Sequence, residues 1–93
     1  MTREAIKHKI DEILIKELDL PKNYFNSKEN GGEDLVMKEE WEIDHVRMYL
    51  ITSKIEETLD LLVNDQHLNH IHLTYRELID TFYNEYLRER RGY

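Results

Sequence analysis

Cysteine is absent from the 93-residue sequence, and proline and glycine are scarce, with one proline and three glycines. Without cysteine, neither a disulfide nor a cysteine-ligated metal can stabilise the fold, and the cysteine content gives no support for secretion. No apolar run approaches the ~20 residues that a membrane-spanning helix needs, and no apolar signal region follows the first charged residues. These absences predict a single soluble, cytoplasmic domain over residues 1–93, of modest stability.

Positive charge is also scarce. The sequence has 13 lysines and arginines against 20 aspartates and glutamates, which gives a net charge of −7. A protein that binds phosphate backbones normally carries a basic face, so we expect no nucleic-acid partner. The acids are concentrated between residues 29 and 65, where eleven acids accompany three bases. This region can attract a basic partner, or it can be a solvated surface with no binding role.

Apolar residues recur at spacings of three and four in three long segments, which predicts three long helices. The first follows a candidate N-cap at Thr2 and ends before Pro21. The second follows a candidate N-cap at Asp44, and the third opens with a capping box from Thr74 to Glu77. We therefore predict an all-α fold, a small bundle of three long helices and one short helix.

The same periodicity assigns a core. Its predicted members are Ile10, Ile13, Leu14, Leu18, Val46, Ile51, Ile55, Leu59, Leu78, Ile79 and Phe82. Leu62 is assigned to the apolar stripe of the second long helix, and the short helix is expected between residues 66 and 73. Asparagine, glycine and acidic residues predict a flexible loop at about residues 26–40.

The order of these segments resembles that of acyl carrier proteins. Residues 18–25 are similar to the exit of the family's first helix, residues 54–60 to the end of its second helix, and residues 73–80 to the entry of its fourth. The correspondence extends from about residue 10 to residue 82. The resemblance implies an acyl-carrier-like helical fold.

In that family a serine at the start of the second helix, within an Asp-Ser-Leu motif, carries phosphopantetheine. The matching positions are Asp44, His45 and Val46, so His45 stands where the attachment serine would be. Imidazole has no hydroxyl to form the phosphodiester. The resemblance therefore implies the fold without the prosthetic group, unless the attachment serine is Ser27 or Ser53.

The resemblance also implies a docking surface, because partners of acyl carrier proteins bind the second helix through basic patches. Acidic residues stand at the matching positions Asp44, Glu56, Glu57 and Asp60. This implies a protein partner with a basic surface, for which an enzyme of the fatty-acid or polyketide type is one candidate.

Three histidines, His67, His70 and His72, lie within six residues. Zinc usually takes about four ligands, and Asp65 could contribute a carboxylate, but the H-E-x-x-H pattern is absent. We expect a polar connector without a metal. Protonation of imidazole near pH 6.5 keeps a pH-responsive role open.

The main hypothesis is a non-catalytic interaction module that docks a basic partner through its acidic second helix. A nucleophile elbow and a phosphate-binding glycine loop are both absent from the sequence, so we expect no enzyme. Two alternatives stay open. One is a working acyl or peptidyl carrier loaded at Ser27 or Ser53, and the other is a histidine-based metal-binding or pH-responsive protein.

Overall fold

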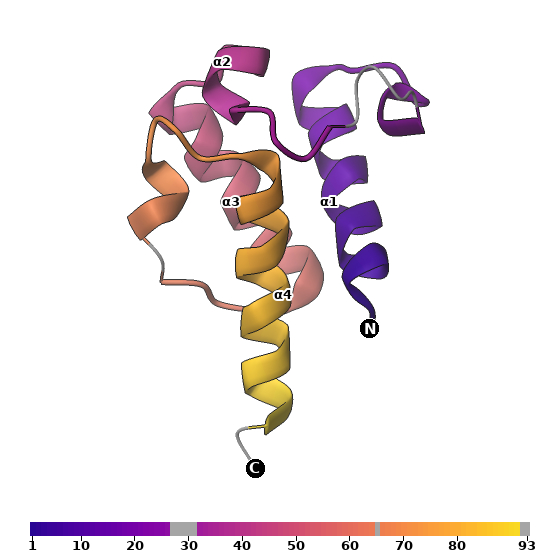
Figure 1. Cartoon of the computed structure of the whole chain (residues 1–93), viewed down its shortest axis with the longest axis vertical. Helices are drawn as coiled ribbons and strands as arrows, with labels where there is room; N and C mark the ends of the chain where they lie inside the picture. Colours follow the sequence, from indigo (N-terminus) through magenta and orange to yellow (C-terminus); the bar gives the residue numbers. More distant parts are fainter. Residues whose placement is uncertain (27–31, 65, 92–93) are drawn as a thin grey trace.

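Helices form nearly all of the regular structure in this chain (Figure 1). The computed structural model describes residues 1–26, 32–64 and 66–91. Its elements are the α-helices α1 (Arg3–Leu18), α2 (Met37–Trp41), α3 (His45–Leu59) and α4 (Tyr75–Arg91), and the 3-10 helices η1 (Tyr24–Asn26) and η2 (Gln66–Asn69). Within these ranges the only strand-like pairing is an isolated antiparallel bridge between Val36 and Thr74. The predicted all-α class is confirmed.

The three long helices begin at the predicted caps. The Ala5 amide donates to Thr2 Oγ1 over 3.1 Å, and the Arg47 amide donates to Asp44 Oδ1 over 2.7 Å. The capping box at the start of α4 is reciprocal, since the Glu77 amide donates to Thr74 Oγ1 over 3.1 Å and the Thr74 amide donates to Glu77 Oε1 over 3.0 Å. Each cap satisfies amides that the helix itself leaves without partners.

Three helices end on an acidic residue in the left-handed conformation. These C-caps are Asp19 after α1, Glu42 after α2 and Asp60 after α3, with φ angles of 53°, 51° and 54°. The left-handed region disfavours residues with a Cβ, and a carboxylate at a helix C-terminus meets the negative end of the helix dipole. Packing must therefore hold these helix ends in place.

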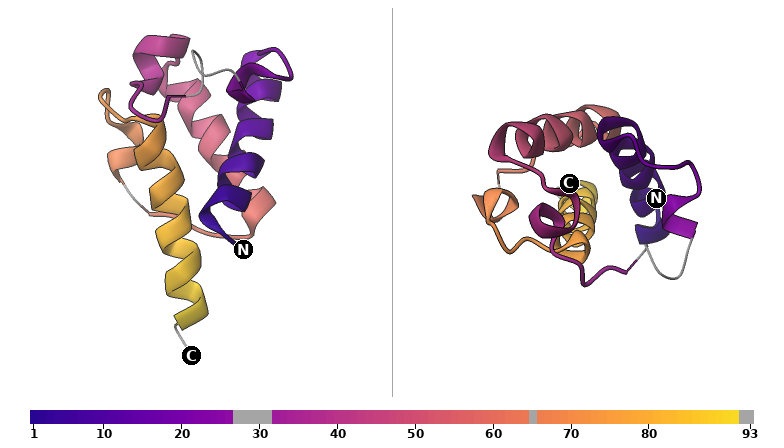
Figure 2. Two further views of the ribbon diagram at one scale, coloured as in Figure 1. Left: turned by 45° about the vertical axis from the view of Figure 1, so that its right-hand side comes forward. Right: turned by 90° about the horizontal axis from the view of Figure 1, so that it is seen from above.

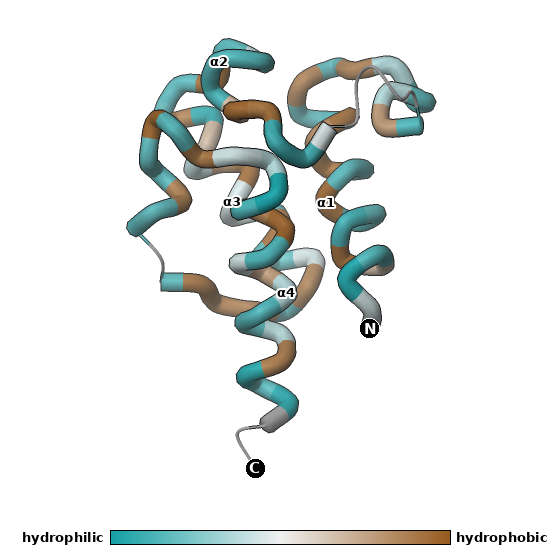
Figure 3. Tube along the Cα trace, in the orientation of Figure 1, coloured by the Kyte–Doolittle hydropathy of each residue, from teal (hydrophilic) through white to brown (hydrophobic). Residues whose placement is uncertain are grey.

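The long helices enclose one core, with α1 packed against both α3 and α4 (Figure 2). The C-terminal part of α4 extends beyond the other helices. Hydrophobic and polar residues alternate along each helix in the pattern of a partly buried face (Figure 3). The buried apolar side chains are Ile6, Ile10, Leu14, Met37, Ile43, Met48, Ile51, Ile55, Leu61, Leu68, Leu73, Tyr75, Leu78, Ile79 and Phe82.

The predicted core is confirmed on α4, is confirmed on α1 for Ile10 and Leu14, and is partly wrong on α3. The side chains of Ile13, Leu18 and Leu59 lie partly exposed at the edge of the core. Val46 is 71% exposed and Leu62 is 77% exposed, so both assignments are wrong. The buried stripe of α3 is Met48, Ile51 and Ile55, at spacings of three and four. Val46 therefore points away from the core, and Leu62 lies beyond the end of α3.

The flexible loop predicted at residues 26–40 is wrong in its second half. Residues 37–40 belong to α2, whose Met37 is fully buried. The Met37 amide donates to the Leu73 carbonyl over 3.0 Å, and the Tyr75 amide donates to the Leu35 carbonyl over 3.0 Å. These bonds tie the segment to the start of α4. Residues 32–36 of the predicted loop form no helix, and residues 27–31 lie outside the described residues. The expected short helix is present as η2.

Truncation of a buried side chain of α3 and truncation of an exposed one should have different effects on stability. Ile55→Ala should lower the free energy of unfolding by about 2–5 kcal/mol, because it leaves a cavity in the core. Val46→Ala should change it by less than about 0.5 kcal/mol, because the side chain is exposed. Urea denaturation of both variants checks this, and equal losses would contradict the burial pattern.

Candidate functional site

The outer face of α3 carries apolar side chains that no other part of the described chain covers. Opposite the buried stripe, Val46, Tyr49 and Leu50 are 71%, 67% and 44% exposed. The spacing of three and four residues places these side chains on one face of the helix. Uncovered apolar side chains that share a face are typical of an interaction surface.

The structure brings three of the four predicted docking acids together. Glu56, Glu57 and Asp60 line a hollow of about 600 Å³ at the C-terminal end of α3, which Ser53 also lines. Asp44 lies at the other end of the helix, where it caps the first turn. Glu57 and Asp60 are exposed, whereas Glu56 is half-buried. The predicted acidic helix face is therefore concentrated in the last turns of α3.

These acids are not neutralised within the described chain. None of the four forms an ion pair with another described residue. Two bases form ion pairs with other acids, Arg3 with Glu33 at 2.6 Å and Lys54 with Glu17 at 2.6 Å. Hydrogen bonds from these bases lower the pKa of Glu33 and of Glu17. The charge at the end of α3 therefore remains available to an external cation.

His45, at the position of the family's attachment serine, is the first residue of α3 and is exposed. Its Nδ1 lies 3.2 Å from Lys38 Nζ, which also donates to the Asn69 carbonyl over 2.9 Å. This contact joins α2 to α3 and η2. The two serines named as alternatives differ, because Ser53 is half-buried on α3 and Ser27 lies outside the described residues.

The three histidines of the connector lie close together. The ring centroids of His67 and His70 are 5.4 Å apart and those of His70 and His72 are 5.3 Å apart. His67 Nε2 contacts the Glu77 carboxylate, and the pKa of Glu77 is lowered by its bond from the Thr74 amide and by this contact. In residues 1–26, 32–64 and 66–91 no three histidine or acidic side chains converge as metal ligands. Asp65 lies outside that part.

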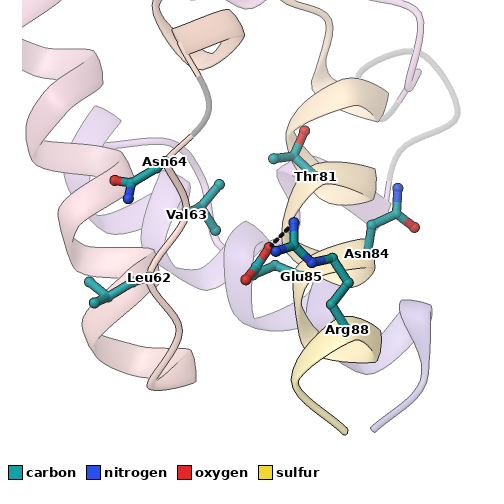
Figure 4. Close-up of a pocket in the computed structure, with 7 residues that line it drawn as sticks. All are labelled: Leu62, Val63, Asn64, Thr81, Asn84, Glu85 and Arg88. Carbon is teal, nitrogen blue, oxygen red and sulfur yellow. Dashed lines mark ion pairs between the residues drawn. The ribbon is translucent and has the colours of Figure 1, made fainter. Parts of the chain in front are cut away.

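A second hollow, of about 480 Å³, separates residues 62–64 from α4 (Figure 4). Thr81 lies on its α4 side and donates its hydroxyl to the Glu77 carbonyl over 2.7 Å. Arg88 folds back toward Glu85, with Nη1 3.4 Å from Oε2, and Leu62 points away from α4. The two charged residues of this hollow, Glu85 and Arg88, therefore neutralise each other.

A buried charged cluster, which sequence reasoning missed, joins α1 to α4. Asp11 is 7% exposed and lies 2.9 Å from Lys7 Nζ, and it accepts a hydrogen bond from the Tyr75 hydroxyl. Lys7 Nζ also lies 5.5 Å from the Tyr75 ring centroid and 5.7 Å from that of Phe25. Burial raises the pKa of Asp11, and the bond from Lys7 opposes this shift. In the sequence, burial of Asp11 is indicated by its position beside Ile10 in the apolar stripe of the first helix.

Comparison with models of protein families, with curated proteins and with solved structures gave no match to this chain. None of the helices in the described ranges has the length and apolar character to span a membrane. The candidate site therefore rests on its own geometry.

The raised pKa of Asp11 makes its contribution to stability depend on pH. Because the folded state favours the protonated carboxyl, this contribution is fully present below the pKa of the unfolded chain and is lost as pH rises through the folded pKa. The stability of the wild type relative to Asp11→Asn should therefore fall as the pH is raised through the range above about 4, the ordinary pKa of an aspartate. Urea denaturation across this range measures the difference, and a constant difference would contradict the assignment.

Proposed function

We propose that this protein is a non-catalytic interaction module that docks a basic protein partner through the outer face of α3 and carries no prosthetic group. One observation carries the proposal. The exposed side chains of Val46, Tyr49 and Leu50 continue along α3 into Glu57 and Asp60, which form no ion pair with the described chain. An apolar surface next to unneutralised acids fits an amphipathic basic partner.

The two parts of this surface make different contributions to binding. Burial of apolar area contributes roughly 25 cal/mol for each Å² removed from water, so Val46, Tyr49 and Leu50 supply most of the affinity. An exposed ion pair contributes only about 0–1 kcal/mol. Glu57 and Asp60 instead raise the association rate and set the orientation of the partner.

The resemblance to acyl carrier proteins adds support of a different kind. A long α1, an α3 that begins after Asp44, the short η2 and a long α4 occur in the order that the resemblance implies, with η1 and α2 between α1 and α3. The partner would then be a protein with a basic surface, such as an enzyme of the fatty-acid or polyketide type. His45 at the serine position is the reason to propose docking without a phosphopantetheine group.

Docking can be tested with a synthetic helical peptide that carries leucine on one face and arginine and lysine beside it. We expect fluorescence anisotropy to show binding that weakens as salt is added, because the interaction is partly electrostatic. The double variant Glu57→Lys/Asp60→Lys should weaken binding by about tenfold, since two attractions become repulsions.

The matched control reverses two exposed acids of α1, in the variant Glu4→Lys/Glu12→Lys, so that the net charge changes equally. This control should retain most of the binding. An equal loss in both double variants, or equal binding of a peptide with glutamate in place of its bases, would overturn the proposed surface.

The alternative of a working carrier has one observation in its favour, since Ser53 lines the acidic hollow on α3. Incubation with coenzyme A and a phosphopantetheinyl transferase, followed by intact-mass measurement, separates the two functions. We expect no mass gain, because His45 stands at the attachment position. A phosphopantetheine adduct mapped to Ser53 or Ser27 would establish the carrier function instead.

A further inference from the structure

A separate hollow, of about 440 Å³, lies between α3 and η2, next to the docking face. Tyr49 and Glu56 line it from α3, and Val63 and Asn64 line it from the segment that follows the helix. The residues of η2 close the opposite side. Tyr49 belongs to both this hollow and the outer face of α3, so a partner on that face can place a side chain here.

Glu56 is held in a fixed position within the hollow. Its Oε2 accepts a hydrogen bond from the Val63 amide over 2.9 Å, which fixes the carboxylate against the end of α3. Its Oε1 accepts no hydrogen bond from any described residue. A carboxylate with one oxygen anchored and the other available is prepared to receive a charged donor.

The other walls of the hollow suit a planar cation with several donors. Tyr49 is 67% exposed, and its ring offers an aromatic face for stacking. Asn64, Gln66 and Asn69 also line the hollow, and each of these residues carries a side-chain amide oxygen that can accept a hydrogen bond. Lys38 donates to the Asn69 carbonyl at 2.9 Å, so a cation should enter at the Glu56 end, away from this charge.

We propose that this hollow binds an arginine side chain of the basic partner, which rests on the docking function proposed above. The guanidinium pairs with Glu56 and stacks on Tyr49, while its apolar stem lies against Val63. A guanidinium has five donors in a rigid plane and can satisfy the carboxylate and the amide oxygens together. The ammonium of lysine is a point charge and cannot both stack and bridge in this way, so the hollow should prefer arginine.

The inference can be tested by NMR titration of the isotope-labelled full chain with N-acetyl-arginine amide, with N-acetyl-lysine amide as the comparison. The arginine compound should give saturable shifts at Tyr49, Val63 and Asn64 in the millimolar range, as expected for so small a ligand. The lysine compound should bind several-fold more weakly.

The variant Glu56→Gln should weaken binding of the arginine compound by about tenfold, because it removes the charge. The glutamine keeps a carbonyl oxygen to accept the Val63 amide, and thermal unfolding confirms that the fold is retained. Tyr49→Leu should weaken binding several-fold by removing the aromatic face. The matched control is Glu12→Gln, which changes an exposed acid of α1 outside this hollow and the docking face and should leave the affinity within about twofold.

Equal binding of the two compounds, or shifts centred on Glu57 and Asp60, would overturn the arginine hollow. Either result leaves the docking surface standing if the helical peptide still binds and still responds to the double charge reversal. Loss of peptide binding would overturn the docking function itself, so the two failures can be distinguished.

Discussion

The hydrogen bond between the buried hydroxyl of Tyr75 and the carboxylate of Asp11 joins the first and last long helices, and the surrounding structure is organised around it. Lys7 balances the charge of Asp11 and lies over the Tyr75 ring. Phe25 and Trp41 pack against the same ring, with centroids 5.3 Å and 6.1 Å away. Tyr75, which belongs to α4, thus contacts residues of α1, η1 and α2. A buried carboxylate is costly unless it is paired, so this arrangement constrains all of its neighbours.

Local signals predicted the helix starts, whereas the burial of α3 required tertiary information. The caps at Asp44 and Thr74 depend on residues at most three positions away, so the sequence alone identifies them. The apolar residues of α3 occupy more than one face, and Val46 is as hydrophobic as a core residue. Periodicity could not decide that Met48 is inside and Val46 outside. The sequence did not predict helix α2, because the buried Met37 at its start donates its amide to the carbonyl of Leu73, which is distant in sequence.

The sequence predicts which acidic residues belong to the candidate site, but it does not predict how they are placed relative to one another. The run of acids near the end of α3 is visible in the sequence, but only the fold separates Glu56, anchored on Val63, from exposed Glu57. The division matters chemically because an anchored carboxylate can select among cations, while an exposed one mainly attracts them. The Asp11 cluster escaped prediction for the same reason, since its partner Tyr75 lies 64 residues away.

The left-handed C-cap at Asp60 has a consequence for how two molecules meet. The last turn of α3 is the negative end of its helix dipole, which acts as about half a negative charge, and Asp60 and Glu57 add their full charges at the same end. Glu89 of α4 lies beside the same end, where it lines the hollow of Glu57 and Asp60. Negative charge gathered in this way makes the electric field around the protein uneven, so an approaching cation is drawn toward the α3 terminus before any atoms touch.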